Sequence, residues 1–226
     1  MRLLLIRHGQ TPANVRGELD TAAPGPALTE LGRTQAAAVP DALTSERIDG
    51  IYVSRLIRTQ QTAAPLARVR GEMHRVVLPG IHEIEAGNLE GRTDKRAIRR
   101  YVKTIWAWGD GKLSKRMPGA GDGHEFYARF DADIARVVAE HDPGATVAVF
   151  SHGAAIRVWT AARATNIAPD FPGRQHLDNT GMVALEGSPT EGWIVTHWGG
   201  EPLGGAQLND PDADDIAGET LAEAAE

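Results

Sequence analysis

The chain has no cysteine among its 226 residues. That absence excludes a disulfide scaffold, a cysteine-ligated zinc site and a thiol nucleophile. Long apolar runs are missing as well, because the run near the start covers only residues 3–6 before Arg7 and His8. A signal peptide needs a longer apolar region, and a membrane span needs about 20 apolar residues. We therefore expect a cytoplasmic protein with no membrane partner.

The chain also lacks a basic surplus. It carries 24 Lys and Arg against 30 Asp and Glu, a formal net charge of −6. Eight of the acidic residues fall in residues 201–226, which contain no Lys or Arg, so residues 1–200 hold 22 acidic and 24 basic residues. This balance does not favour a nucleic-acid partner. It indicates one domain over residues 1–200, followed by an acidic, flexible tail at 201–226.

Short apolar segments alternate with helical patterns along the chain. The segments with the composition of strands are residues 3–6, 48–53, 76–78, 146–150, 183–185 and 193–197. Helical patterns lie between them. This alternation predicts an α/β protein, a three-layer α/β/α sandwich around a mainly parallel sheet. Residues 92–140 are expected to form a helical insertion that covers the site.

Two of the expected strands end in the same way. The first runs into residues 7–9 (Arg-His-Gly), and the strand at 146–150 runs into residues 151–153 (Ser-His-Gly). Ligands bind at the carboxyl ends of strands in an open parallel sheet. One His-Gly pair is usually an ordinary turn, but two pairs at corresponding strand ends predict a functional site around His8 and His152.

These segments resemble the histidine phosphatase superfamily, in its phosphoglycerate-mutase-like branch. The resemblance covers about residues 1–91 and 145–200. It depends on segments in the family's order, which are residues 7–11 (Arg-His-Gly-Gln-Thr), 28–33 (Leu-Thr-Glu-Leu-Gly-Arg), 54–63 (Ser-Arg-Leu-Ile-Arg-Thr-Gln-Gln-Thr-Ala), 82–84 (His-Glu-Ile) and 151–153 (Ser-His-Gly). It implies the phosphoglycerate-mutase-like fold and a small phosphorylated substrate.

The resemblance also implies the site residues. The implied catalytic set is His8, Arg7, Arg58, Glu83 and His152, and the implied substrate-binding set is Gln10, Asn14 and Gly153. In this scheme His8 accepts the phosphoryl group, Glu83 is the general acid and base, and no metal or other cofactor takes part. Arginine suits the phosphate because its planar fork grips two oxygens and keeps its charge. A histidine is an available nucleophile near neutral pH, since its ordinary pKa is about 6.5.

The alternative activity is that of a phosphoglycerate mutase. True mutases resemble one another after the glutamate, with Arg, His, Tyr and Gly, whereas residues 84–87 of this chain are Ile-Glu-Ala-Gly. We therefore expect phosphomonoester hydrolysis, with the mutase and an inactive binding module as alternatives. The sequence leaves open the substrate, the oligomeric state, and whether His124 and the basic segment 95–103 face the pocket.

Overall fold

The computed structural model describes residues 1–217. Its strands are β1 (Arg2–Arg7), β2 (Gly50–Ser54), β3 (Arg75–Leu78), β4 (Thr146–Ser151), β5 (Met182–Ser188) and β6 (Gly192–Gly199). Its α-helices are α1 (Pro12–Val15), α2 (Glu30–Ala42), α3 (Ile57–Val69), α4 (Lys95–Gly109), α5 (Gly123–Ala139) and α6 (Gly153–Arg163). Short 3₁₀ turns lie at Pro79–Ile81, Gly87–Leu89, Phe171–Arg174 and Ala206–Leu208.

The six strands form one sheet in the order β3-β2-β4-β1-β5-β6. Strands β3, β2, β4 and β1 pair in parallel, whereas β5 pairs antiparallel with both β1 and β6. The expected mainly parallel sheet is therefore confirmed, with an antiparallel pair added at one edge. Strand β1 lies at the centre, and its four apolar residues are fully buried. Burial on both faces explains why this strand is a continuous apolar run.

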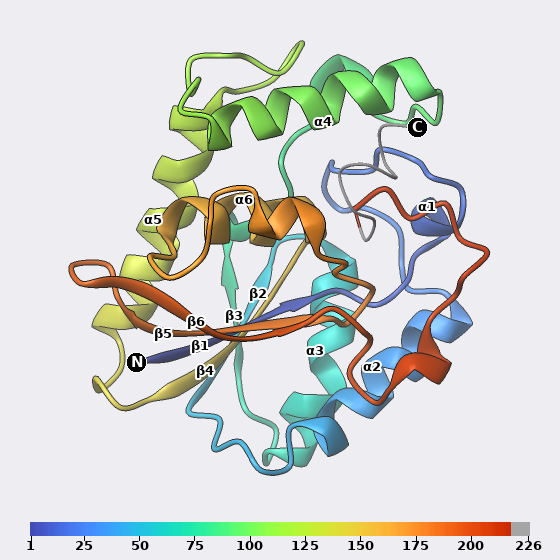
Figure 1. Cartoon of the computed structure of the whole chain (residues 1–226). Helices are drawn as coiled ribbons and strands as arrows, with labels where there is room; N and C mark the ends of the chain where they lie inside the picture. Colours follow the sequence, from blue (N-terminus) through green and yellow to red (C-terminus); the bar gives the residue numbers. More distant parts are fainter. Residues whose placement is uncertain (218–226) are drawn as a thin grey trace.

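Helices cover both faces of the sheet, which confirms the three-layer sandwich (Figure 1). Alternate residues of β1 point to opposite faces, so Leu3 and Leu5 join the apolar cluster that contains α5 and α6. Leu4 and Ile6 join the second cluster, which contains residues of α2 and α3.

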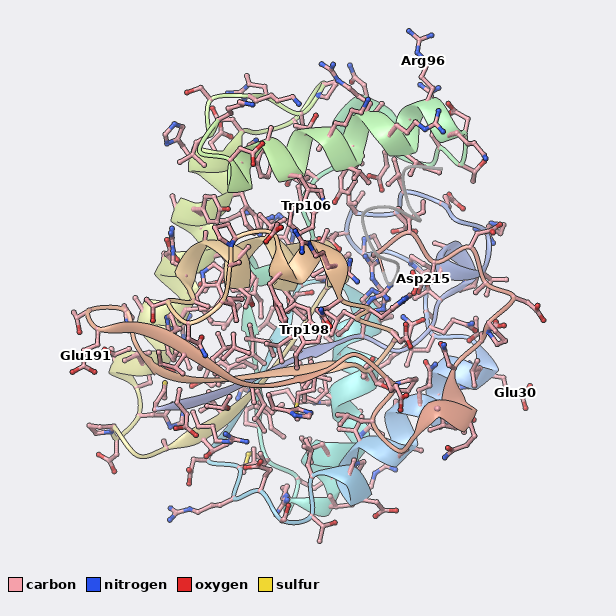
Figure 2. All side chains as sticks on the ribbon, in the orientation of Figure 1. Glu30, Arg96, Trp106, Glu191, Trp198 and Asp215 are labelled. Carbon is pink, nitrogen blue, oxygen red and sulfur yellow. The ribbon has the colours of Figure 1, made fainter. Side chains whose placement is uncertain are left out.

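Helix α4 lies above α6, on the far side of that helix from the sheet (Figure 1). Its inner face is buried through Tyr101, Ile105 and neighbouring apolar residues. Its outer face is basic, and Figure 2 shows Arg96 pointing away from the body of the protein. The exposed basic side chains of this helix are those of Lys95, Arg96, Arg99, Arg100 and Lys103. The basic segment 95–103 therefore faces outward, and the apolar face of α4 is turned toward the pocket.

The start of the acidic tail contacts the body of the protein. Pro202 is buried, and the Gln35 side chain donates a hydrogen bond of 2.8 Å to the carbonyl of Leu208. The segment then returns to the carboxyl edge of the sheet, where its acidic side chains meet buried basic and amide groups. Residues 218–226, the rest of the expected tail, lie outside the described residues. Within residues 1–217, no helix is both long and apolar enough to cross a membrane.

Candidate active site

The pairing register brings the two histidines together. In the parallel β1–β4 pair, Arg7 lies opposite Ser151. The residues that follow, His8 and His152, therefore emerge side by side at the carboxyl edge of the sheet. Their ring centroids are 5.2 Å apart, with an angle of 61° between the ring planes. The repeated strand-His-Gly pattern in the sequence thus corresponds to one site, as expected.

His8 is oriented by its own backbone neighbour. Its Nδ1 lies 2.8 Å from the carbonyl oxygen of Gly9, so Nδ1 carries the hydrogen and donates it. Nε2 is then the unprotonated nitrogen, with its lone pair available for attack. Burial lowers the pKa of His8 well below its usual 6.5, and the positive charges of Arg58 and Arg7 lower it further. The imidazole is therefore neutral at neutral pH.

The turn after His8 depends on a close backbone approach. A Cβ atom on Gly9 would lie 2.6 Å from the carbonyl oxygen of Gly32, at the first turn of α2. Thr29 caps that helix by accepting a hydrogen bond of 2.9 Å from the Gly32 N–H. The backbones of segments 7–11 and 28–33 thus lie in contact at Gly9 and Gly32, and neither position has room for a side chain.

His152 is held by Ser54 at the end of β2. The Ser54 hydroxyl accepts a hydrogen bond from the Leu56 N–H and lies 2.7 Å from Nε2 of His152. We assign the hydroxyl hydrogen to His152 Nε2, which places the ring hydrogen on Nδ1. That Nδ1 is buried and has no partner among the described residues. It is therefore free to donate to an oxygen of a bound anion.

Two buried arginines supply positive charge. Arg7 is fully buried at the end of β1, and Arg58 is 3% exposed in the first turn of α3. Arg58 donates to Asp20, through 3.3 Å to its carboxylate and 2.9 Å to its backbone carbonyl. Both Nη atoms of Arg7 donate to the carboxylate of Asp215, each over 2.6 Å. Two guanidinium groups beside neutral histidines can bind a dianionic group such as a phosphate.

Glu83 caps helix α6 from another part of the chain. The first residue before α6 gives no side-chain cap, and the carboxylate of Glu83 accepts the N–H groups of Ala154 and Ala155 instead. Burial raises the pKa of Glu83, whereas hydrogen bonds from backbone N–H groups and the charge of Arg58 oppose that rise. A buried carboxyl with a raised pKa beside two histidines can donate or accept a proton.

The proton site on Glu83 can be assigned from its contacts. Oε1 accepts hydrogen bonds from the N–H groups of Ile84 (2.8 Å) and Ala155 (2.9 Å). Among the described residues, Oε2 accepts only from the Ala154 N–H, over a longer 3.2 Å. Because Oε2 keeps the more available lone pair, we assign the acidic hydrogen to Oε2.

The three expected substrate-binding residues lie in different settings. Asn14 lines the pocket, and its Nδ2 donates a hydrogen bond of 3.0 Å to Asp215. The Gln10 side chain joins Thr29 to Asp210 and is not among the lining residues found in the described part of the chain. Gly153 begins α6 against Arg7, with no room for a side chain.

His124, which the sequence left open, and Arg55 both lie away from the histidines. His124 is exposed at the start of α5, where its Nε2 lies 3.4 Å from the Ser114 hydroxyl. Arg55 is exposed and pairs with Glu85 over 3.4 Å. Neither is among the residues that line the pocket within the described part of the chain.

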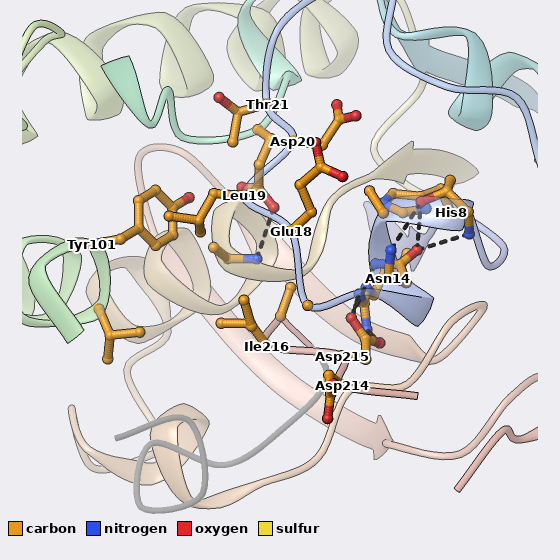
Figure 3. A pocket seen from close by; sticks show the side chains of 18 of the residues that line it. His8, Asn14, Glu18, Leu19, Asp20, Thr21, Tyr101, Asp214, Asp215 and Ile216 are labelled. Atoms are coloured by element: carbon orange, nitrogen blue, oxygen red, sulfur yellow. Dashed lines mark hydrogen bonds and ion pairs between the residues drawn. The ribbon is translucent and has the colours of Figure 1, made fainter. Parts of the chain in front are cut away.

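The pocket beside His8 has a cavity volume of about 70 Å³. Figure 3 shows Tyr101 and Leu19 on one side of it and Asn14 with Asp215 on the other. Its apolar wall consists of Leu19, Tyr101, Val102, Ile105, Trp106 and Ile216, and the acidic side chains around it are Glu18, Asp20, Asp214 and Asp215 in addition to Glu83. Within residues 1–217, no three His, Cys, Asp or Glu side chains are arranged to hold a metal ion.

Sequence reasoning missed three supports of this site. Ser54 was given no role in the site, although its hydroxyl lies 2.7 Å from Nε2 of His152. Glu90 accepts hydrogen bonds from Thr21 and from the Ala22 N–H, which holds the loop that carries Asp20. The third support, Asp215, is 208 positions from Arg7, so no local pattern could have indicated it. For Ser54, the one signal was its place at the start of segment 54–63 of the family resemblance.

Comparisons with known proteins identify the family and the fold of the chain. The chain matches the model of the histidine phosphatase superfamily (branch 1) over residues 3–199. It is 39% identical over 217 residues to the PE-PGRS family protein PE_PGRS11 of Mycobacterium tuberculosis, a match that covers 90% of this chain but 37% of that protein. It is 29% identical over 198 residues to glucosyl-3-phosphoglycerate phosphatase of the same species, covering 82% of this chain and 85% of the relative.

A solved structure is similar over most of the chain. It is that of the mycobacterial glucosyl-3-phosphoglycerate phosphatase in complex with VO3, with a TM-score of 0.74 and 26% identity. The similarity covers 88% of this chain and 99% of the other. The chain thus spans nearly the whole of that phosphatase and little more than a third of PE_PGRS11.

Proposed function

The chain belongs to the histidine phosphatase superfamily (branch 1), and from this premise we propose that it is a metal-independent phosphomonoester hydrolase. The observation that carries the proposal is the state of His8, which is neutral, buried and held through Nδ1 with Nε2 free. Arg7, Arg58 and His152 surround it, and Glu83 completes the catalytic set. The named phosphatase relative supports hydrolysis of a small phosphorylated compound as the reaction class.

In the first step, the Nε2 lone pair of His8 attacks phosphorus while the bond from phosphorus to the leaving oxygen breaks. Glu83 gives its Oε2 proton to that oxygen, because an alkoxide is a poor leaving group. The products are an alcohol and a phosphohistidine. Arg7, Arg58 and the Nδ1–H of His152 bind the phosphoryl oxygens, where charge is stabilised in the transition state.

In the second step, water attacks the phosphorus and the bond to His8 Nε2 breaks. The carboxylate of Glu83 now accepts a proton from the water, so the acid of the first step is the base of the second. Inorganic phosphate leaves, and both His8 and Glu83 return to their starting states. No group other than these side chains and water is needed to balance the reaction.

Hydrolysis is favoured over the mutase reaction by the wall opposite the histidines. A mutase must hold a second anionic group of its substrate, and this wall is apolar with acidic residues at its edge. The cationic lining residues in the described part are Arg7, Arg58 and Arg157. The guanidinium of Arg157 donates to the carbonyl of Gln175 and is 4% exposed. The assembled catalytic set also argues against an inactive binding module.

The test is hydrolysis of p-nitrophenyl phosphate with EDTA present, for the unchanged protein and for His8→Ala. We expect release of p-nitrophenol that persists in EDTA and disappears in His8→Ala. The reaction should proceed through an acid-labile phosphoprotein that His8→Ala does not form. A second reaction contains 3-phosphoglycerate with a trace of the 2,3-bisphosphate. Isomerisation faster than phosphate release would favour the mutase reaction over hydrolysis. Undiminished turnover by His8→Ala would refute the assignment of His8 as the nucleophile.

A further inference from the structure

A carboxylate of the chain itself is bound where the proposed phosphate would bind. The two oxygens of Asp215 accept from the two Nη atoms of Arg7, each over 2.6 Å. The Nδ2 of Asn14 donates to the same carboxylate over 3.0 Å. Figure 3 shows this contact, with Asp214 and Ile216 continuing along the pocket. Of these donors, Arg7 is assigned to the phosphoryl group in the proposed mechanism, and Asn14 belongs to the expected substrate-binding set.

The contact has the form of ligand recognition. A guanidinium fork binds carboxylate and phosphate through the same pair of parallel hydrogen bonds. Arg7 is fully buried, and its Nη1 also donates to the carbonyl of Leu177 over 2.8 Å. Both Nη atoms are therefore engaged by Asp215, so a phosphate cannot use this fork until that carboxylate leaves.

Neighbouring residues seat the segment on both sides of Asp215. Before it, the carboxylate of Asp210 accepts a hydrogen bond of 2.7 Å from Gln10. After it, the carbonyl oxygen of Ala217 would lie 2.7 Å from a Cβ atom on Gly153. The segment thus runs against the loop after β1 and the start of α6, the two elements that carry the histidines.

The charge of Arg7 does not depend on Asp215 alone. Burial lowers the pKa of Arg7, but the acidic groups around it, with Asp215 first among them, together outweigh burial. When Asp215 leaves, Asp178 remains nearby and a dianionic phosphate would replace the lost charge. A phosphate can therefore replace the Asp215 carboxylate without leaving the buried guanidinium of Arg7 unpaired.

We propose that residues 210–217 form an autoinhibitory strap, in which Asp215 occupies Arg7 and Asn14 in place of the substrate phosphate. The inference rests on the proposed function, since it takes these residues as the phosphate site. The strap is tethered, so its effective concentration at the site is on the order of millimolar. Substrate binds only to the fraction of molecules in which the strap is released, and its apparent affinity falls by that fraction.

The first test compares Asp215→Asn with Asp212→Asn. Both changes remove one negative charge from the strap, but Asp212 is exposed and does not line the pocket. We expect Asp215→Asn to lower KM for p-nitrophenyl phosphate, and the inhibition constant of inorganic phosphate, by about tenfold with kcat nearly unchanged. We expect Asp212→Asn to resemble the unchanged protein. Equal effects of the two variants, no effect, or a loss of kcat in Asp215→Asn would overturn the proposal.

The second test supplies the strap in trans. A chain that ends at Asn209 should be inhibited competitively by a peptide of residues 209–217. The same peptide with Asp215→Asn should inhibit about tenfold less, because it lacks the charge that the arginine fork binds. Equal inhibition by both peptides would show that Asp215 is not the group recognised, and absence of inhibition by either would also refute the strap.

A third measurement does not require turnover. Hydrogen exchange of the strap amides is followed with and without orthovanadate, while calorimetry records vanadate binding to the full chain and to the chain ending at Asn209. We expect tighter binding to the shortened chain and faster exchange of the strap when vanadate is bound to the full chain. Vanadate binding without faster exchange would overturn the strap alone. Absence of binding to either chain would overturn the proposed function, and the strap with it.

Discussion

Replacement of Glu83 by glutamine tests the assignment of its proton most directly. Glutamine keeps an oxygen that can accept from the Ile84 and Ala155 N–H groups. Its amide nitrogen takes the place of Oε2, where it faces the Ala154 N–H and loses one hydrogen bond. That loss costs on the order of 1 kcal/mol of folding free energy. The variant is therefore expected to remain folded, which a thermal melt followed by circular dichroism would check.

The kinetic effect depends on the leaving group. An alkyl phosphate needs a proton on its leaving oxygen, so its kcat/KM should fall by about 10²- to 10⁴-fold in Glu83→Gln. An activated aryl phosphate leaves as a stable phenolate, so its kcat/KM should fall by about tenfold or less. The second step still lacks its base in the variant. The phosphohistidine should then accumulate, and p-nitrophenyl phosphate should give a burst close to one product molecule per site before a slow steady rate.

The matched control is Glu85→Gln. Glu85 is half-exposed and pairs with His82 and Arg55, outside the pocket. Its replacement should change kcat/KM little for both substrates. If Glu83→Gln lowered kcat/KM equally for the alkyl and aryl substrates and gave no burst, Glu83 would be neither the acid nor the base.

Two further predictions follow from the histidines. Burial and the charge of Arg58 lower the pKa of both His8 and His152 in the folded protein. Below about pH 6.5 the unfolded chain therefore binds more protons than the folded protein. The free energy of unfolding should then fall on acidification, by up to about 1.4 kcal/mol per pH unit for each of the two histidines. Urea titrations at a series of pH values check this, and His8→Gln should reduce the slope; a slope that stays the same would contradict the assignment. Ser54→Ala removes the hydroxyl that lies 2.7 Å from His152 Nε2, and it should lower kcat by about tenfold with little change in KM. Ser54→Thr keeps the hydroxyl and should retain more activity than Ser54→Ala. A larger loss of activity in Ser54→Thr would contradict the hydrogen-bond role.

The sequence predicted those site residues whose positions are set by strand pairing. His8 and His152 follow paired strands, and the repeated His-Gly pattern was enough to bring them together. The family resemblance added Arg58 and Glu83, whose positions no local pattern could fix. The acidic tail was expected to be loose because its composition is polar, and composition does not show that one of its carboxylates would find Arg7. The outward direction of the basic face of α4 was also unsettled, since it depends on which side of that helix packs on α6.

The central place of β1 also has a consequence for how the protein is made. Its four apolar residues are synthesised well before its partners β4 and β5, which begin only at Thr146 and Met182. Until those strands have left the ribosome, β1 lacks both of the neighbours it has in the described sheet, and its apolar side chains are exposed. The two histidines meet only when the β1–β4 register forms. Catalytic activity should therefore appear late in folding, and recovery of activity after dilution from denaturant would report completion of the sheet.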